Sequence, residues 1–590
     1  MLNKILNKSN GISFCDAFTK EDGSVITDHC QIVQHFNDYF VNIGNKLAGG
    51  VPQSVNNFKT YLKGSYMDSF VMYLTDPNEV IQIVNGFANK SSYGSDFIPV
   101  SIMKDCVVQI AEVLSKIINC SFSTGCFPNA LKIAKVCPIY KTGPRNLFSN
   151  YRPIPVLPSF SKIFEKMAYN RLEAYINSHN ILKNNQYGFR SVHSTYMAIL
   201  DMHEKISESI DKHEVSIGVF IDLSKAFDTI NHEILLNKLE HYGIRGIPLQ
   251  WFRDYLTYRK QFVCYRNISS CLEPITCGVP QGSILGPLMF ILYVNDIMQC
   301  SEILHFILFA DDTNLFYSSC DYVDLMKTVN SELAKLSEWF RANRLSLNVA
   351  KTNYILFGNR KKCISDARFA ICIDNNTIER VPFTKFLGVY VDEDLNWKQH
   401  TTEISKKISK SLGILNRLKF ILPRKILVTL YLTMIHPYLI YCTMVWGGGS
   451  LLALNKLICL QKRALRLITC SYFRAQSNPL FVKLGILKLQ DIYKYQILMF
   501  VYKFKHNLLP SCCMHLLQVR SSSGPYFLRH ESDFIKISYR TLLRKKSMAV
   551  SGPELWDCLS DVIKISACLV IYKKRLVEFL KCSYENTLET

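Results

Sequence analysis

The chain has 590 residues, too many for a single hydrophobic core, and 48% of them are hydrophobic, which excludes an intrinsically disordered protein. The 69 Lys and Arg against 48 Asp and Glu give a formal net charge of +21, so the expected partner is a polyanion, either nucleic acid or an acidic membrane surface. The 21 cysteines form no CxxC pair and no Cys/His cluster with zinc spacing, and residues 1–14 lack the apolar core of a signal peptide. These features favour an intracellular protein with reduced thiols, in the nucleus or the cytoplasm.

The first two thirds of the chain predict an extension followed by a mixed domain. Residues 1–95 are expected to be mainly helical, and Gln31–Ala48 repeats apolar residues at helical spacing. Residues 96–365 alternate helical segments with strand-like runs (VSIGVFIDL, FVCYRNIS, HFILFADD and NYILFG), which is typical of an α+β domain with helices behind a sheet. Arg368–Val381 is expected to form a hairpin with its turn at Asn375-Asn376.

From about residue 400 the sequence is helical, basic and apolar, which predicts a second, mainly α-helical part. Leu427–Trp446 imitates a membrane span, but His436 and Pro437 interrupt it and predict a buried helix broken at the proline. Ser521–Pro525 is expected to be a loop. The helices expected in this part are Leu412–Lys419, Lys425–Leu432, Asn455–Ile468 and Asp491–Lys505.

Two acidic segments point to chemistry. Asp222 ends the apolar run Val219–Ile221 and precedes a turn into a helix, which places its carboxylate at a sheet edge. Asp311 and Asp312 interrupt the runs FILFA and LFY, which predicts a hairpin with Asp311 at its tip. An isolated Asp-Asp pair is usually an ordinary polar turn. If the two strands are neighbours, however, three carboxylates converge, and divalent cations such as a pair of Mg²⁺ ions would offset their repulsion and support phosphoryl transfer.

A loop rich in glycine and proline, Cys277–Ile297, lies between these acidic segments in the sequence. Gly278, Gly282 and Gly286 permit close backbone approach, and the prolines stiffen the entry into a helix. Such a loop can lie against a base or a sugar.

Three segments, VFIDLSKAFDTINH, GVPQGSILGPLMF and FADDTNLF, together resemble the palm motifs of reverse transcriptases. Their wording is closest to that of non-LTR retrotransposons of the jockey and CR1-like kind. The resemblance implies an α+β right-hand polymerase, with fingers and an antiparallel palm sheet at 96–365, a primer grip and helical thumb at 366–480, and a basic helical region at 481–590. Further segments that match in order are Val136–Lys166, Asn185–Thr195, Trp339–Thr352, Phe383–Trp397, Leu460–Ile468 and Gly552–Trp556.

The resemblance also implies roles for individual residues. Asp222, Asp311 and Asp312 would bind two Mg²⁺ ions, or Mn²⁺, and Lys351 would donate a proton to the pyrophosphate leaving group. Phe227 would be a steric gate against the ribose 2′-OH. Lys351 has the alternative of a plain surface lysine and Phe227 that of a core phenylalanine. The remaining nucleotide-binding residues would be Lys141, Arg152, Gln281 and Gly282, and the primer grip Phe386, Leu387 and Gly388.

Tyr493–His506 interleaves Lys with Tyr and Phe, which is typical of a surface that binds phosphates and stacks on bases, or of a buried helix with snorkelling lysines. Pro155 stands where the family usually has a serine.

No RNase H constellation follows residue 480, no zinc knuckle is present, and no segment of endonuclease length precedes Gln31. The chain is therefore expected to be the polymerase portion of an element.

The leading hypothesis is an RNA-directed DNA polymerase that extends a DNA or RNA 3′-OH with deoxynucleoside triphosphates on an RNA template, with DNA as primer or target and no membrane partner. One alternative is a catalytically inactive or domesticated nucleic-acid-binding remnant. Another is a related polymerase, such as a group II intron maturase or an RNA-copying viral enzyme. Phe227 argues against the viral enzyme, and the wording around Gln281 argues against the maturase.

Overall fold

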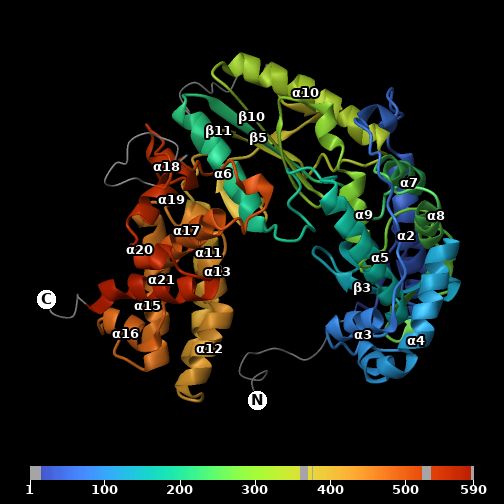
Figure 1. Cartoon of the computed structure of the whole chain (residues 1–590), viewed down its shortest axis with the longest axis horizontal. Helices are drawn as coiled ribbons and strands as arrows, with labels where there is room; N and C mark the ends of the chain where they lie inside the picture. Colours follow the sequence, from blue (N-terminus) through green and yellow to red (C-terminus); the bar gives the residue numbers. More distant parts are fainter. Residues whose placement is uncertain (1–14, 359–369, 375, 521–532, 586–590) are drawn as a thin grey trace.

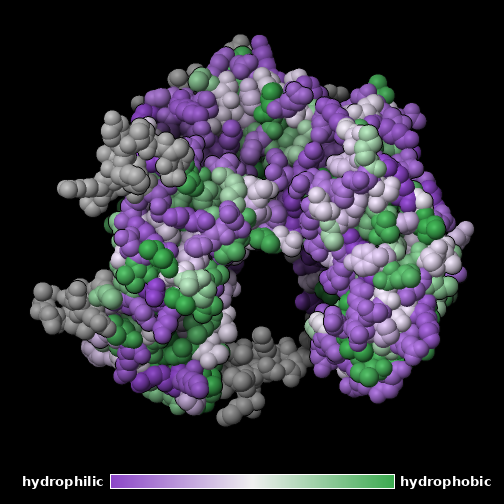
Figure 2. All heavy atoms as spheres, in the orientation of Figure 1, coloured by the Kyte–Doolittle hydropathy of each residue, from purple (hydrophilic) through white to green (hydrophobic). Residues whose placement is uncertain are grey.

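Two arms descend from a central β-sheet and enclose an open space (Figures 1 and 2). The computed structural model describes residues 15–358, 370–374, 376–520 and 533–585. The elements before α6 (Thr195–Asp211), together with α7 (His232–His241) and α8 (Ile247–Leu256), build the first arm, and the helices from residue 398 onward build the second. The segment tested for a signal peptide and the expected loop Ser521–Pro525 lie outside the described residues.

The central sheet has the strand order β14-β11-β5-β10-β9. Its strands are β5 (Val215–Ile221), β9 (His305–Phe309), β10 (Asp312–Ser319), β11 (Asn353–Phe357) and β14 (Glu379–Arg380). Neighbouring strands are antiparallel, except that β14 runs parallel to β11. The sheet confirms an α+β architecture and three of the predicted strand-like runs.

Helices cover both faces of this sheet, whereas the sequence led us to expect them behind it on one side. All seven residues of β5 are buried, as in a strand with no solvent face. The odd-numbered β5 side chains, from Val215 to Ile221, pack in the core that contains α9 (Leu285–Tyr293) and α10 (Tyr322–Ala342). Phe220, whose side chain lies on the opposite face of β5, packs in a second core that contains α6.

The first arm holds a second sheet, with β3 at its centre between β4 and β6. The predicted helix at Gln31–Ala48 is observed as α2, which packs on this sheet through Phe36. α4 is, among the described residues, the one long helix apolar enough to cross a membrane by length and composition, and its Met103, Ala111 and Ile118 lie in the core. The elements of this arm are β1 (Phe18–Thr19), β2 (Val25–Ile26), α2 (His29–Gly49), α3 (Pro77–Gly86), α4 (Val100–Thr124), β3 (Ile133–Tyr140), β4 (Tyr151–Val156), α5 (Ser159–Ser178), α7, α8, β6 (Lys260–Tyr265), β7 (Ile268–Ser269) and β8 (Glu273–Pro274).

The second arm is helical, as predicted, and shares one core with α6. The helix in Leu427–Trp446 is interrupted at the expected place: α12 ends at Met434, and α13 begins at His436 with Pro437 in its first turn. The helices of this arm are α11 (Lys398–Leu418), α12 (Arg424–Met434), α13 (His436–Ile440), α14 (Thr443–Trp446), α15 (Leu451–Thr469), α16 (Asn478–Leu484), α17 (Leu489–Lys505), α18 (Leu542–Lys545), α19 (Met548–Asp557), α20 (Asp561–Lys564) and α21 (Leu569–Glu585).

Helix α17 tests the two interpretations of Tyr493–His506. Most of its aromatic and aliphatic side chains are buried, including Phe500, Tyr502 and Phe504. Its aromatic residues therefore serve the core. Lys494 is exposed and Lys503 is half-buried at the surface of the arm.

The second arm is tied to the central sheet through α6. Glu204 of α6 accepts a hydrogen bond at 3.0 Å from Nη1 of Arg544, and both side chains are buried. Asp211, at the end of α6, accepts from the backbone N–H of Thr541 at 2.7 Å and from its hydroxyl at 2.8 Å. Residues near the carboxyl end thus close onto a helix from the middle of the chain.

The predicted hairpin at Arg368–Val381 is present in its described part. Cys372–Ile373 (β12) pairs antiparallel with Asn376–Thr377 (β13). Asn376 lies opposite Ile373 as a strand residue, so its predicted place in the turn was wrong. Arg368, Phe369 and Asn375 lie outside the described residues.

Candidate active site

The three predicted carboxylates lie at one edge of the central sheet. β9 and β10 form the predicted hairpin, in which Asp312 is paired with Phe309, so that Ala310 and Asp311 make its tight turn. Asp222 directly follows β5, whose last residue Ile221 lies opposite Thr313 of β10. Continuing this antiparallel register by one position places Asp222 beside Asp312. Strand pairing therefore brings together acidic residues that are 90 positions apart in the sequence.

The charges of these carboxylates disfavour one another. Desolvation raises the pKa of Asp312 to about 6, and the charges of Asp311 and Asp222 add to the shift. Desolvation and the charge of Asp222 also raise the pKa of Asp311, which Arg152 and Lys141 partly offset. A site that holds excess negative charge is suited to bind cations.

This shift predicts a pH dependence of divalent-cation binding. Since the pKa of Asp312 is raised to about 6, acidification below pH 6 protonates the carboxylate and removes a cation ligand. Mn²⁺ affinity, measured by titration calorimetry, should therefore fall as the pH is lowered through 6. In the metal-free protein the sign is opposite: the unfolding free energy should decrease as the pH rises from about 4, the ordinary Asp pKa, towards 6.

The Asp312→Asn variant is the control for both measurements, because it cannot titrate. Its metal-free stability should lack this step between pH 4 and 6, and its residual Mn²⁺ affinity should vary less with pH than that of the wild type. An unchanged pH profile in Asp312→Asn would assign the titration to another group.

Asp222 is held in place by residues from a loop after α10. Asn348 Nδ2 donates a hydrogen bond to Asp222 Oδ2 at 2.8 Å, and the Asn348 backbone N–H donates to the Asp222 carbonyl at 2.9 Å. Nζ of Lys351 lies 3.8 Å from Asp222 Oδ2. Lys351 thus lies in the carboxylate cluster. Asn348 is a site residue that the sequence analysis missed, although it falls within the matching segment Trp339–Thr352.

Three cations, Lys141, Arg152 and Lys351, interact with the carboxylates. Desolvation lowers the pKa of Lys141, as do the charges of Arg152 and Lys351, while Asp222 and Asp311 oppose the shift. These predicted residues are therefore close enough to interact electrostatically. Lys225 lies beside these cations: desolvation lowers its pKa, Asp228 opposes the shift, and the charges of Lys141, Arg152 and Lys351 add to it. Sequence analysis missed Lys225, whose only signal was its place three residues after Asp222.

Phe227 is fixed by aromatic packing. Its ring stacks on Phe290 of α9 with ring centroids 4.5 Å apart, and Phe189 approaches at 6.1 Å edge to face. The side chain is half-buried against the core. The two interpretations of Phe227 are therefore compatible, since the packing that makes it a core residue also fixes the orientation of its ring.

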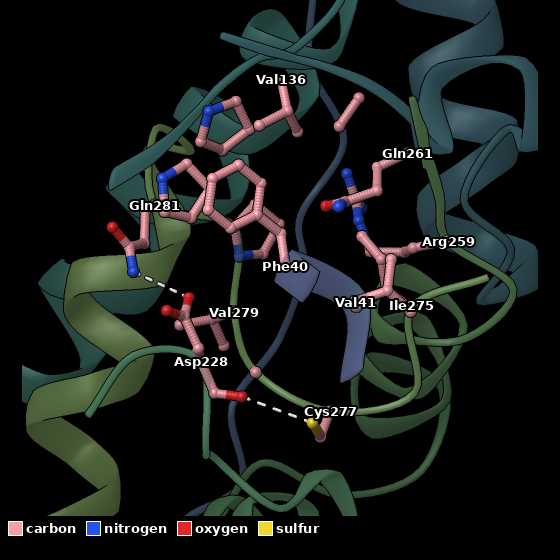
Figure 3. A pocket seen from close by; sticks show the side chains of 15 residues that line it. Phe40, Val41, Val136, Asp228, Arg259, Gln261, Ile275, Cys277, Val279 and Gln281 are labelled. Atoms are coloured by element: carbon pink, nitrogen blue, oxygen red, sulfur yellow. Dashed lines mark hydrogen bonds between the residues drawn. The ribbon is translucent and has the colours of Figure 1, made fainter. Parts of the chain in front are cut away.

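Gln281 and Gly282 lie in a loop that touches the first arm. A Cβ atom on Gly282 would lie 2.5 Å from the carbonyl oxygen of Pro155 in β4, so only glycine fits this close approach. Gln281 Nε2 donates a hydrogen bond to Asp228 Oδ1 at 2.7 Å, at the edge of a pocket between α2, the second sheet and this loop (Figure 3). Desolvation raises the pKa of Asp228 to about 6. Asp228, to which the sequence analysis gave no role, thus orients Gln281.

Residues 139–391 match the family described as reverse transcriptase (RNA-dependent DNA polymerase). The chain contains a reverse transcriptase domain. Every site residue predicted from the sequence lies within it, from Lys141 to Gly388.

Curated relatives agree with this assignment and with the predicted resemblance to jockey-like elements. The chain is 28% identical over 417 residues to the probable RNA-directed DNA polymerase from transposon BS of Drosophila melanogaster, covering 67% of this chain and 45% of that protein. It is 28% identical over 413 residues to the corresponding protein of the X-element, covering 68% and 44%. It is 26% identical over 458 residues to the RNA-directed DNA polymerase from the mobile element jockey of the same organism, covering 75% and 49%. The chain thus spans about half the length of these relatives.

A support beneath the Asp311 turn of the reverse transcriptase domain was not predicted. Gln186 Oε1 accepts hydrogen bonds from the backbone N–H of Ala310 at 3.1 Å and from that of Gly188 at 2.8 Å. Ala310 has a φ of 57°, a left-handed conformation that is strained for alanine. A Cβ atom on Gly188 would lie 2.3 Å from the Ala310 nitrogen. The turn that carries the carboxylates is therefore fixed by Gln186 and by the absence of a side chain at Gly188.

The predicted primer-grip residues form a tight hairpin in the reverse transcriptase domain. Phe383–Phe386 (β15) pairs with Val389–Asp392 (β16), and the turn residues Leu387 and Gly388 have φ values of 44° and 88°. The Tyr441 hydroxyl donates to the Leu387 carbonyl at 2.5 Å. Phe386 is buried in the core and Leu387 packs against it, so both side chains support the hairpin, while Gly388 is exposed.

The donor set of the domain suits a hard divalent cation. Among the described residues, no three His, Cys, Asp or Glu side chains already have the arrangement of a metal site. The oxygen-only set of Asp222, Asp311 and Asp312 nevertheless fits the preference of Mg²⁺, and the raised pKa values of Asp311 and Asp312 mark negative charge that a cation would offset.

Proposed function

We propose that this protein is an RNA-directed DNA polymerase that copies RNA into cDNA during retrotransposition, by extending a DNA or RNA 3′-OH with deoxynucleoside triphosphates. The observation that carries the proposal is the convergence of three carboxylates, Asp222, Asp311 and Asp312, with three cations inside a reverse transcriptase domain. An inactive nucleic-acid-binding remnant is the second candidate. The three carboxylates argue against the remnant. They repel one another and would repel phosphates, so their convergence is useful only to a protein that binds cations there.

The proposed architecture is that of a right hand. Residues 96–365, which include most of the first arm and of the central sheet, would act as fingers and palm, preceded by an extension at 1–95 whose helix α2 packs on the second sheet. Residues 366–480 would form the primer grip and thumb, and residues 481–590 a basic helical region. The open space between the arms supports this assignment, since a primer–template duplex needs a passage of this kind (Figure 2). The proposed partners are an RNA template, a DNA primer or target and deoxynucleoside triphosphates, in the nucleus or the cytoplasm.

The acidic residues of the site would bind metal ions, and the basic residues would bind the triphosphate. Asp222, Asp311 and Asp312 would hold two Mg²⁺ or Mn²⁺ ions, which when bound activate the primer hydroxyl and stabilise the leaving oxygen. Arg152 and Lys141 would bind the triphosphate, with Arg152 suited to bidentate contact. Three further residues would act on the leaving group, the sugar and the base: Lys351 by donating a proton to pyrophosphate, Phe227 by closing the space beside the 2′ carbon, and Gln281 by lining the nascent base pair.

A primer-extension assay tests the proposal. Purified protein, a primed RNA template, deoxynucleotides and Mg²⁺ should yield full-length cDNA, and chelation of the metal should stop the reaction. Folded protein that binds the primed template but yields no product with either Mg²⁺ or Mn²⁺ would contradict the proposal and favour the remnant.

The Phe227→Val variant is expected to accept ribonucleotides. The smaller side chain opens the space beside the 2′ carbon, so the preference for deoxynucleotides over ribonucleotides should fall about 100-fold, as expected for the loss of a steric contact worth about 3 kcal/mol. The ratio of kcat/KM for the two sugars measures it. Phe290→Leu, which perturbs the stacked partner alone, is the control and should retain most of the preference. An unchanged ratio in Phe227→Val would leave Phe227 as a core residue only.

A further inference from the structure

Four large apolar side chains are exposed at the free end of the second arm. The exposed fractions are 83% for Phe420, 77% for Tyr472, 74% for Phe473 and 52% for Ile421. Phe420 and Ile421 lie in a first loop, which connects α11 with α12. Tyr472 and Phe473 lie in a second loop, which connects α15 with α16. Figure 1 places α12 and α16 at the end of the arm farthest from the central sheet. We refer to these four residues as the tip patch.

The two loops of the tip patch form one surface. Sγ of Cys470 lies 3.9 Å from the carbonyl oxygen of Lys419. Behind them, Leu418 of α11 and Ile468 of α15 are buried in the same core. The loops that carry Phe420 and Tyr472 therefore meet at their first residues.

Hydrogen bonds fix the shape of the second loop, and a cation–π contact orients a ring on the first. The Ala475 N–H donates to the Tyr472 carbonyl at 3.0 Å, and Arg466 Nε donates to the Ala475 carbonyl at 2.9 Å. Nζ of Lys419 stands 4.7 Å above the Phe420 ring. Since the loops are already ordered, little conformational entropy is lost when a ligand stacks on their aromatic rings.

The only charged side chains in the two loop segments that carry the tip patch are positive. Residues 416–426 and 469–478 contain no Asp or Glu. Exposed aromatic rings among cations are the combination that binds single-stranded nucleic acid, because bases stack on the rings while phosphates pair with the cations. The cations in these two segments are Arg417, Lys419, Arg424, Lys425 and Arg474.

The proposed function narrows the choice of strand. Stacking needs unpaired bases, and in RNA-templated synthesis the template is unpaired outside the copied region, whereas the product leaves as a duplex. The tip patch lies at the far end of the arm from the carboxylates, so a segment bound there is not the segment being copied.

We propose that the tip patch is an anchoring site for a single-stranded segment of the template RNA. Phe420, Tyr472 and Phe473 stack on bases, and the neighbouring cations contact the phosphates. The choice of template RNA rests on the proposed polymerase function, and the site itself rests on the exposed rings and their charge.

Fluorescence anisotropy with a labelled, unstructured RNA oligonucleotide tests the site. The F420A/Y472A/F473A variant should bind this RNA at least about tenfold more weakly, since each base–aromatic stack is a substantial part of such affinity. Its affinity for a blunt RNA–DNA heteroduplex should stay within about twofold of wild type, because paired bases cannot stack on the rings. The matched control removes two exposed aromatic residues of the first arm, in the variant Y93A/F97A, and should leave RNA binding unchanged.

Three results would overturn the proposal: wild-type RNA affinity in the triple variant, an equal loss of duplex binding, or loss of binding to anionic lipid vesicles with RNA binding retained. The primer-extension assay separates this proposal from the polymerase function. If the wild-type protein makes no cDNA, and the triple variant nevertheless binds RNA more weakly than wild type, the polymerase function is refuted and the tip patch is kept as an RNA-binding site. An active enzyme whose RNA binding does not depend on these rings would refute the site alone.

Discussion

The Asp311→Asn variant is expected to lose RNA-templated DNA synthesis by about 1,000-fold or more. The substitution keeps the size of the side chain but removes one charge from the proposed cation ligands, and such a loss of charge stabilisation is worth several kcal/mol in the transition state. Single-turnover extension of a primed RNA with saturating deoxynucleotides measures the effect on the chemical step. Affinity for the primed template should change little, because Asp311 lies in a tight turn at the sheet edge.

A second measurement on the same variant distinguishes a lost ligand from a damaged fold. Desolvation and Asp222 raise the pKa of Asp311, so removing its charge should leave the metal-free protein at least as stable as wild type in thermal unfolding. Asp105→Asn, in which an exposed carboxylate of α4 is neutralised, is the matched control and should retain full activity. Activity of Asp311→Asn within tenfold of wild type would remove Asp311 from the proposed cation ligands.

Gly188→Ala is expected to lower the rate of DNA synthesis by about 100-fold in a protein that still folds. The new Cβ atom would meet the Ala310 nitrogen at 2.3 Å, and because the obstacle is backbone the Ala310–Asp311 turn must move. A displacement of about 1 Å in a catalytic constellation is enough for a loss of this size. Single-turnover extension measures the rate, and circular dichroism confirms that the fold persists.

The control for this steric argument is Gly413→Ala, in which a Cβ atom is added to α11 where nothing lies within 4 Å. That variant should keep wild-type activity and gain about 1 kcal/mol in stability, since alanine is the better helix former. If Gly188→Ala kept wild-type activity, the turn would tolerate displacement, and Gln186 and Gly188 would not be positioning residues.

The parts of the site that the sequence predicted depend on local patterns. Two apolar runs, FILFA and LFY, are interrupted by Asp311 and Asp312, which indicates a hairpin, and Asp222 directly follows the apolar run Val219–Ile221. Pairing between β5 and β10 then brings the carboxylates together without further information. Local periodicity likewise predicted α2, α12, α15 and α17, and the last third of α11, because each has an apolar face at helical spacing.

The parts that were missed depend on contacts between distant segments. Gln186 supports a turn 124 positions later, and Asp228 meets Gln281 across 53 positions. Nothing in the neighbourhood of either residue specifies such a partner. The helices on both faces of the central sheet were missed for a related reason. The apolar character of β5 indicates that both faces of the strand are covered, but the sequence of the strand does not say which elements cover them.

The attachment of α6 to residues near the carboxyl end has a consequence for where the polypeptide can be divided. The match to the reverse transcriptase family ends at residue 391, yet the buried carboxylate of Glu204 is satisfied by Arg544 and by the backbone N–H groups of Met548 and Ala549. A fragment that stopped at residue 391 would lose these partners of Glu204 and would expose the apolar side of α6 to water. The segment that matches the family is therefore smaller than the unit we expect to fold on its own, because the core around α6 includes helices well beyond residue 391.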